Sequence, residues 1–214
     1  MSRHKQRKFN ELATFTNFYS NPFVFKGKWN NEIFNNANPV VLELGCGKGE
    51  FSIHLSKQFP TTNFIGIDLD GARLWRAAKN ALNEKSTNVV FVQANIDKIT
   101  EMFSSNEVSE IWIPFPDPYP KPSKWKKRLI STTFLEKYKQ ILHPNAILHF
   151  KTDNTALFEF GLKSIVEAGF KICEQTHDLY QSPLLNDFNS IPSYFEQVFM
   201  AKGESIKYVR FQMI

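Results

Sequence analysis

One loop of the chain combines a carboxylate, an aromatic ring and a stiff backbone. The segment 114–121 reads Pro-Phe-Pro-Asp-Pro-Tyr-Pro-Lys, and each proline restricts it because the ring holds φ at about −65°. A rigid carboxylate and ring, here Asp117 and Tyr119, could position a flat substrate. The alternative interpretation of the same residues is a solvated, proline-rich surface loop.

Basic residues form two clusters. The first follows the loop, contains no acid, surrounds Trp125 and consists of Lys121, Lys124, Lys126, Lys127 and Arg128. The second lies at the N-terminus, in residues 3–8. Gathered positive charge is typical of a surface that binds a phosphate backbone, in agreement with a net charge of +5 and a pI of about 9.1. A solvated face and a soluble tail are the alternatives.

A glycine-rich turn follows the apolar run 40–44. Gly45, Gly47 and Gly49 stand in this turn, ahead of an amphipathic segment. Glycines let a ligand approach the backbone amides and the N-terminus of the following helix. The same spacing occurs in dinucleotide-binding folds and elsewhere, so the turn indicates a ligand site but not the ligand.

Three polar residues on or just after neighbouring strands narrow the choice of ligand. Glu43 lies within the strand before the turn, where a buried carboxylate needs a partner. A ligand ammonium or a nearby lysine would supply one, whereas a pyrophosphate would be repelled. Asp68 ends the next strand, where an acid receives ribose hydroxyls in doubly wound folds, and Asn95 could reach an adenine edge. S-adenosylmethionine carries all three groups, and NAD is the weaker alternative.

Short apolar runs alternate with amphipathic segments from residue 39 onward. We expect strands at 40–44, 63–67, 88–92, 110–113 and 146–150, and helices at 50–58, 70–82, 98–103, 131–142 and 154–167. Asp70 and Ser131 are expected to cap two of these helices, and Gly169 to end the last one. The alternation predicts right-handed βαβ units and a parallel sheet.

The last part of the chain has a different pattern. Residues 170–175 and 206–213 are expected to form two strands that pair antiparallel at the sheet edge, because no crossover helix is evident between them. The segment 179–196 is too long for a simple turn. Loops of that length in compact domains are usually functional or disordered.

The length of 214 residues suits one domain, which we place at 39–214 after a basic N-terminal extension at 1–38. Cys46 and Cys173 are far apart and lack metal-ligand spacing, so we expect no metal site and a reducing, cytoplasmic location. No apolar run approaches the ~20 residues of a membrane span, and no apolar h-region follows the charged N-terminus. We therefore expect no contact with a membrane. The sequence leaves open a monomer or a homodimer.

These motifs together resemble the bacterial tRNA (guanine-N7-)-methyltransferase family. The resemblance runs from about residue 39 to the C-terminus and is looser before it, in Lys26-Gly-Lys28-Trp29. The family's Phe-Pro-Asp-Pro-Trp-Pro-Lys box stands here at 115–121, its Thr-Asp pair at 152–153 and its Thr-x-aromatic-Glu motif at 193–196. The sequence departs from the family pattern in Tyr119 for Trp, Asn95 for an acid, Ser193 for Thr, and Pro122, Ser123 and Trp125 for basic residues. We expect the first three departures to alter binding strength more than the reaction.

The resemblance implies a Rossmann-like, class I S-adenosylmethionine-dependent methyltransferase fold, with a mostly parallel seven-stranded sheet and an antiparallel edge. It implies methyl transfer from S-adenosylmethionine to N7 of the guanine at position 46 in the tRNA variable loop, giving 7-methylguanosine. The implied cofactor-binding residues are Glu43, Gly45, Gly47, Gly49, Asp68, Asn95 and Asp117, and Asp117 is also the implied catalytic residue. The implied substrate contacts are Lys121, Asp153, Ser193, Tyr194, Phe195 and Glu196, with Lys124, Lys126, Lys127 and Arg128 on the RNA backbone.

Methyl transfer to guanine N7 needs little activation of the nucleophile by the enzyme. Its in-plane lone pair is nucleophilic and carries no proton, so catalysis is mostly alignment with the sulfonium methyl. Asp117, Asp153 and Glu196 are candidates to accept hydrogen bonds from N1–H and the N2 amine, which adenine lacks. Helix capping is the alternative for the last two. The loop also resembles the Asp-Pro-Pro-Tyr box of amino-group methyltransferases, but its second proline is missing.

Three classes of function stay open at this point. The first is the tRNA methyltransferase, whose target base must be splayed out because side chains cannot enter the deep major groove of A-form RNA. The second is a methyltransferase of the same fold that acts on another RNA base, a protein or a small molecule. The third is a non-catalytic RNA-binding protein.

Overall fold

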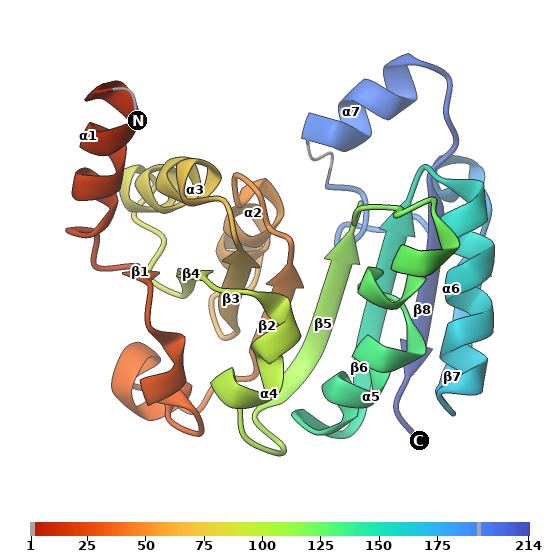
Figure 1. The fold of residues 1–214 in the computed structure, drawn as a ribbon, viewed down its shortest axis with the longest axis horizontal. Helices are drawn as coiled ribbons and strands as arrows, with labels where there is room; N and C mark the ends of the chain where they lie inside the picture. Colours follow the sequence, from red (N-terminus) through yellow and green to blue (C-terminus); the bar gives the residue numbers. More distant parts are fainter. Residues whose placement is uncertain (1–2, 192–193) are drawn as a thin grey trace.

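The computed structural model describes residues 3–191 and 194–214, with the side chains of 6–191 and 196–214, and contains within them an eight-stranded sheet (Figure 1). The strands are β1 (Phe18–Tyr19), β2 (Val40–Leu44), β3 (Asn63–Asp68), β4 (Val89–Gln93), β5 (Val108–Pro114), β6 (Leu142–Thr152), β7 (Lys171–Thr176) and β8 (Lys207–Gln212). Their order is β1-β4-β3-β2-β5-β6-β8-β7. Neighbouring strands are parallel except that β8 runs antiparallel to β6 and β7.

This topology confirms the parallel α/β sheet with an antiparallel edge. The strands β2 to β8 are the seven that the sequence predicted. The eighth, β1, comes from the N-terminal segment and pairs in parallel with β4. The sheet therefore extends into the N-terminal segment 1–38, ahead of the domain expected at 39–214.

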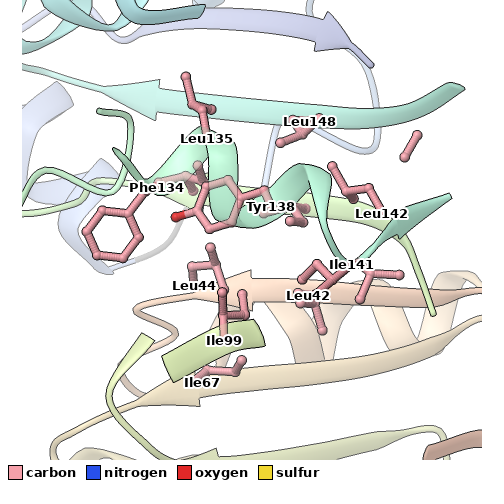
Figure 2. Close-up of a cluster of buried hydrophobic side chains, with 14 of the residues drawn as sticks. Leu42, Leu44, Ile67, Ile99, Phe134, Leu135, Tyr138, Ile141, Leu142 and Leu148 are labelled. Carbon is pink, nitrogen blue, oxygen red and sulfur yellow. The ribbon is translucent and has the colours of Figure 1, made fainter. Parts of the chain in front are cut away.

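Helices cover both faces of the sheet. One face carries α4 (Ile99–Met102), α5 (Thr132–Lys139) and α6 (Thr155–Glu167), and the other carries α2 (Glu50–Gln58) and α3 (Gly71–Asn83). Figure 2 shows part of the first layer, where Tyr138 of α5 and Ile99 of α4 lie with Leu44 of β2 in one buried cluster. Because every residue of β2 and β3 is buried, both faces of these strands need mostly apolar side chains.

Helix ends show where local sequence decides structure and where it does not. Asp70 caps α3 as predicted, since its Oδ1 accepts a hydrogen bond from Ala72 N at 2.8 Å. Gly169 follows α6 with φ +74°, which confirms the predicted helix end. Ser131 is the N-cap residue of α5 as predicted, but its side chain does not bond the helix amides, because its Oγ donates to Lys126 O at 3.2 Å. Helix α5 also ends before Leu142, since that residue already pairs with β5.

The N-terminal segment packs into the fold. Helix α1 (Arg3–Leu12) lies along α3, where Glu11 accepts hydrogen bonds from Trp75 Nε1 at 3.0 Å and Lys79 Nζ at 2.8 Å. Trp29 is completely buried, stacks on Phe103 with ring centroids 5.6 Å apart, and donates from Nε1 to Met102 O at 3.0 Å. Its indole thus belongs to the main core.

The long segment before β8 contains its own helix, α7 (Tyr194–Ala201). Helix α7 lies beyond the carboxyl ends of β5 and β6, near the loop that follows β5 (Figure 1). The predicted functional loop is therefore partly helical and stands at one end of the sheet. Within residues 3–191 and 194–214, no helix is long and apolar enough to cross a membrane.

We expect Trp29→Ala to lower the free energy of unfolding by about 3–5 kcal/mol, because it empties a buried aromatic site and leaves a hydrogen bond unmade. Urea denaturation monitored by circular dichroism measures the change. Val24→Ala, in the same segment but with Val24 54% exposed, is the control and should stay within about 0.5 kcal/mol of wild type. Near wild-type stability of Trp29→Ala would show that residues 18–34 contribute little to the core.

Candidate active site

Two adjoining cavities open at the carboxyl ends of the parallel strands. The first has a volume of about 550 Å³, and its lining includes Glu43, Cys46, Phe51, Thr152, Asp153 and Phe199. The second has a volume of about 630 Å³, and its lining includes Asp68, Leu69, Asn95, Tyr119, Lys126 and Lys127. Both are also lined by Gly45, Arg73, Phe115, Pro116 and Asp117. The cavities therefore meet at Asp117, at the sheet end where ligands bind in parallel α/β folds.

The glycine turn leaves space at the border of the cavities. Gly45 (φ +76°) and Gly47 (φ +56°) have left-handed backbone, and a Cβ on either would meet nothing within 4 Å. A ligand can approach the backbone there. Gly49 differs, because a Cβ on it would come within 2.5 Å of the Phe91 ring, and it lines neither cavity. Gly49 therefore serves the packing of the turn against the sheet, and its implied cofactor contact stays a prediction.

Asp68 joins the glycine turn to the end of β3. It is buried, its Oδ2 accepts a hydrogen bond from Gly47 N at 2.8 Å, and its Oδ1 accepts one from Asp70 N at 2.8 Å. A carboxylate has about four acceptor positions, so two remain for hydroxyl groups in the second cavity. Asn95 lines the same cavity, and its Oδ1 accepts from Asp97 N at 3.0 Å, which orients its amide.

Glu43 is a buried acid in an acidic surrounding. Its Oε2 accepts hydrogen bonds from Ser52 N at 3.1 Å and Ser52 Oγ at 2.5 Å, so its partner among the described residues is Ser52 of α2 and not a lysine. Burial raises the pKa of Glu43 to about 8, and the neighbouring charges of Asp68 and Glu50 add to the shift. A ligand cation would stabilise the ionised form. The sequence-based alternative of a lysine partner is therefore wrong.

The loop after β5 is strained on both sides of Asp117. Phe115 has φ +49° and Tyr119 has φ +38°, a region that side chains of this size rarely adopt. Phe115 N donates to Lys151 O at 2.8 Å, which anchors the start of the loop to β6. Asp117 itself is exposed and lies at the border of the two cavities. Strain of this kind is common where a loop must present a side chain in one direction.

Asp153 lines the first cavity directly after β6. The N-cap of α6 is Asn154, whose Oδ1 accepts from Leu157 N at 2.8 Å. Helix capping therefore does not account for Asp153, and its carboxylate lies in the same cavity as Asp117.

Glu196 occupies a different environment from the one expected of a substrate contact. It forms an ion pair with Lys151 at 2.5 Å, and both side chains are 1% exposed. Tyr180 Oη donates to Glu196 Oε1 at 3.0 Å, and Lys151 Nζ also donates to Asn189 O at 2.7 Å. Glu196 lines neither cavity. In this structure it connects α7 to β6.

The structure describes only part of the motif at 193–196. Ser193 lies outside the described residues. The backbone of Tyr194 and Phe195 belongs to α7, but their side chains lie outside the described part. The implied contacts of these three residues with the substrate therefore stay predictions.

The basic run divides into three environments. Lys121 and Lys124 are exposed and line neither cavity, while Lys126 and Lys127 are exposed and line the second cavity. Arg128 is 5% exposed and donates to backbone carbonyls inside the protein. The expectation that Arg128 faces an RNA backbone does not match this burial.

Sequence reasoning missed three features of the site. Arg73, in the first turn of α3, lines both cavities, and Phe199 of α7 lines the first. Lys151 holds α7 through Glu196. The available signal for Lys151 was a lysine that directly follows the apolar run expected as a strand at 146–150. Among residues 6–191 and 196–214, no group of three or more His, Cys, Asp or Glu is arranged to hold a metal ion.

Solved structures with the same architecture include methyltransferases. The 16S rRNA methyltransferase KamB superposes with a TM-score of 0.64 at 13% identity, covering 87% of this chain and 93% of that one. A SAM-dependent methyltransferase from Aquifex aeolicus superposes with a TM-score of 0.58 at 17% identity, covering 100% of both chains. At such low identity these similarities show the fold, which is that of the Rossmann-like methyltransferases.

Sequence comparison identifies the family. Residues 37–209 match a family described as "Putative methyltransferase", and the chain belongs to this family. It is 42% identical over 219 residues to a tRNA (guanine-N(7)-)-methyltransferase of Bacteroides fragilis, covering 99% of this chain and 86% of the relative. It is 41% identical over 221 residues to the protein of that name in Christiangramia forsetii, covering 99% of both. The Bacillus subtilis protein of that name is 37% identical over 187 residues, covering 87% and 86%.

We expect Glu43→Gln to change how stability depends on pH. The pKa of Glu43 is about 8 in the folded protein, against 4.5 for an unperturbed glutamate side chain, so ionisation favours the unfolded state. The protonated Glu43 side chain contributes fully to the stability of the folded protein below pH 4.5. This contribution is lost as the pH rises through about 8. From about pH 5 to 8 the variant should gain a few kcal/mol relative to wild type without ligand.

Urea denaturation at a series of pH values measures the difference. Glu204→Gln is the control, because Glu204 is exposed and lines neither cavity. Parallel stability profiles of wild type and Glu43→Gln would contradict the raised pKa.

Proposed function

We propose that this protein transfers a methyl group from S-adenosylmethionine to N7 of a guanine in tRNA, at position 46 of the variable loop, giving 7-methylguanosine. The observation that carries the proposal is the place of Asp117, where the cavity lined by Asp68 meets the cavity lined by Glu43 and Asp153. Relatives named tRNA (guanine-N(7)-)-methyltransferase, 41% and 42% identical over nearly the whole chain, support it.

The residues at the glycine turn fit S-adenosylmethionine. Asp68 and Asn95 would hold the ribose and the adenine in the second cavity, and Glu43 would hold the ammonium from the first. Glu43 is buried without a cation among the described residues, so an ammonium supplies a missing charge partner. When bound, the cofactor supplies an electrophilic methyl group.

Two carboxylates would select guanine. Asp117 and Asp153 both line the first cavity, and a carboxylate can accept hydrogen bonds from N1–H and the N2 amine of guanine. Adenine has no donor at N1 and no N2 amine. Since N7 carries no proton, these residues act by orienting the base, and no general base is required. Glu196 contributes by holding α7, since its carboxylate is engaged by Lys151.

The exposed lysines beside the loop would bind the tRNA backbone. Lys121, Lys124, Lys126 and Lys127 are exposed next to the carboxylate loop. Contacts between lysine and phosphate are independent of sequence and weaken with salt. The target base must leave its stack to reach Asp117, because side chains cannot enter the deep groove of A-form RNA. Acting on tRNA would place the protein in the cytoplasm.

The proposal predicts transfer of labelled methyl from S-adenosylmethionine into bulk tRNA, with 7-methylguanosine recovered after nucleoside digestion. Asp117→Ala should lower kcat by about 100-fold or more, because the base loses its orientation, while circular dichroism and cofactor-free stability stay unchanged. Asp187→Ala is the control, since Asp187 is exposed and lines neither cavity. Another modified base would support the alternative of a methyltransferase with a different RNA target. No transfer to RNA would favour a protein or small-molecule substrate.

The proposed RNA surface predicts a charge-dependent loss of binding. Replacing Lys121 and Lys124 by Glu should raise the tRNA dissociation constant about tenfold or more and flatten its salt dependence, because phosphate contacts are lost. Cofactor affinity should not change, since neither residue lines a cavity. The double variant Lys163→Glu and Lys171→Glu carries the same charge change at exposed positions on α6 and β7 and is the control. Equal tRNA affinity of both variants would exclude the loop lysines from the RNA surface.

A further inference from the structure

Arg128 ends the basic run but does not share its environment. Arg128 is 5% exposed, whereas Lys124, Lys126 and Lys127 are exposed. Its guanidinium therefore has a role inside the protein that its place in the sequence does not indicate.

The guanidinium binds the backbone directly after Asp117. Its Nε donates to Pro118 O at 2.8 Å, and its Nη2 donates to Tyr119 O at 3.2 Å. Two donors of one planar group thus hold two successive carbonyls. An arginine fork can make such a paired contact, and a lysine ammonium cannot reproduce its geometry.

Two aromatic rings hold the guanidinium in place. The Arg128 Cζ atom lies 4.9 Å from the centre of the Trp125 ring and 4.3 Å from that of Phe160 on α6. Trp125 Nε1 also lies 3.4 Å from Pro120 O, within reach of a weak hydrogen bond. The carbonyls of residues 118, 119 and 120 are therefore all bound by this cluster of Arg128 and Trp125.

The loop needs an anchor of this kind because it can form few backbone bonds of its own. Pro116, Pro118 and Pro120 have no N–H, so their carbonyls are their only backbone hydrogen-bonding groups. The strained torsions of Phe115 and Tyr119 need support from outside the loop. The hydrogen bond from Phe115 N to Lys151 O supplies this support on one side of Asp117. The hydrogen bonds donated by Arg128 supply it on the other side.

We propose that Arg128 is a positioning residue for methyl transfer, which holds the Asp117 loop in its reactive shape, and is not a phosphate ligand. The proposal rests on the function proposed above. Because Phe160 belongs to α6, whose N-cap Asn154 follows Asp153, the anchor sets the loop of Asp117 relative to the helix next to Asp153. Arg128 thereby fixes the distance between the two carboxylates that would orient guanine.

The test compares Arg128→Ala and Arg128→Lys with wild type, using saturating tRNA and S-adenosylmethionine. Both variants should lose about 100-fold in kcat, since a small displacement of the loop misaligns the base. The slope of log affinity for tRNA against log salt should stay at its wild-type value. Millimolar guanidinium chloride should restore part of the kcat of Arg128→Ala, and the same concentration of NaCl should not.

A phosphate ligand would behave differently. Arg128→Lys would then keep most of the activity, and Arg128→Ala would reduce the salt slope by about 0.7–0.9, as expected for one lost phosphate contact. Lys124→Ala provides the reference for such a change in slope. Either result for Arg128 would overturn the proposal.

Two controls separate positioning from general loss of stability. Ile165→Val removes a methyl group from the buried face of α6 without touching the guanidinium and should lower the melting temperature while keeping kcat. If Arg128→Ala does not fold, Arg128→Lys and Phe160→Leu carry the same test. A wild-type protein without methyl transfer to RNA would refute the proposed function. An active wild type with fully active Arg128 variants would refute only this inference.

Discussion

The site depends on buried carboxylates that the described residues hold with main-chain and hydroxyl donors instead of cations. Asp68 accepts from Gly47 N and Asp70 N, and Glu43 accepts from Ser52. Burial close to a second acid raises the pKa of Glu43 to about 8. A ligand that brings positive charge stabilises the ionised carboxylate of Glu43, whereas a pyrophosphate destabilises it further. The charge at Glu43 therefore favours S-adenosylmethionine over a dinucleotide.

The opposite side of the site is held by residues distant in the sequence. Lys151 accepts from Phe115 N through its backbone and binds Glu196 and Asn189 through its side chain. Burying such an ion pair has a desolvation cost that offsets much of its attraction. The main effect of the ion pair between Lys151 and Glu196 is to position α7. Phe199 of this helix lines the first cavity, and its ring centre lies 5.8 Å from that of Phe115.

Local sequence patterns predicted the elements well where local physics decides them. Strand β2 and helix α2 have the predicted bounds, and Asp70 caps α3. The prediction failed at Leu142, because pairing with β5 recruited a residue whose spacing suited a helix. In the site, Glu43, Asp68 and Asn95 line the cavities, as their positions on neighbouring parallel strands indicated. Gly49 did not, because the space near it is taken by Phe91, far along the chain.

The sequence by itself determined the chemistry available to this protein: a glycine turn, acids at the ends of parallel strands, and a carboxylate in a stiff loop beside lysines. Those features depend on residue type and on the positions of strands along the chain, which local patterns report. Only the tertiary structure decided which charges face a ligand and which are used inside the protein. Glu196 is paired with Lys151, and Arg128 binds the carbonyls of the loop. The reason is physical, since the role of a charge depends on the groups from distant segments that desolvate it and bond to it.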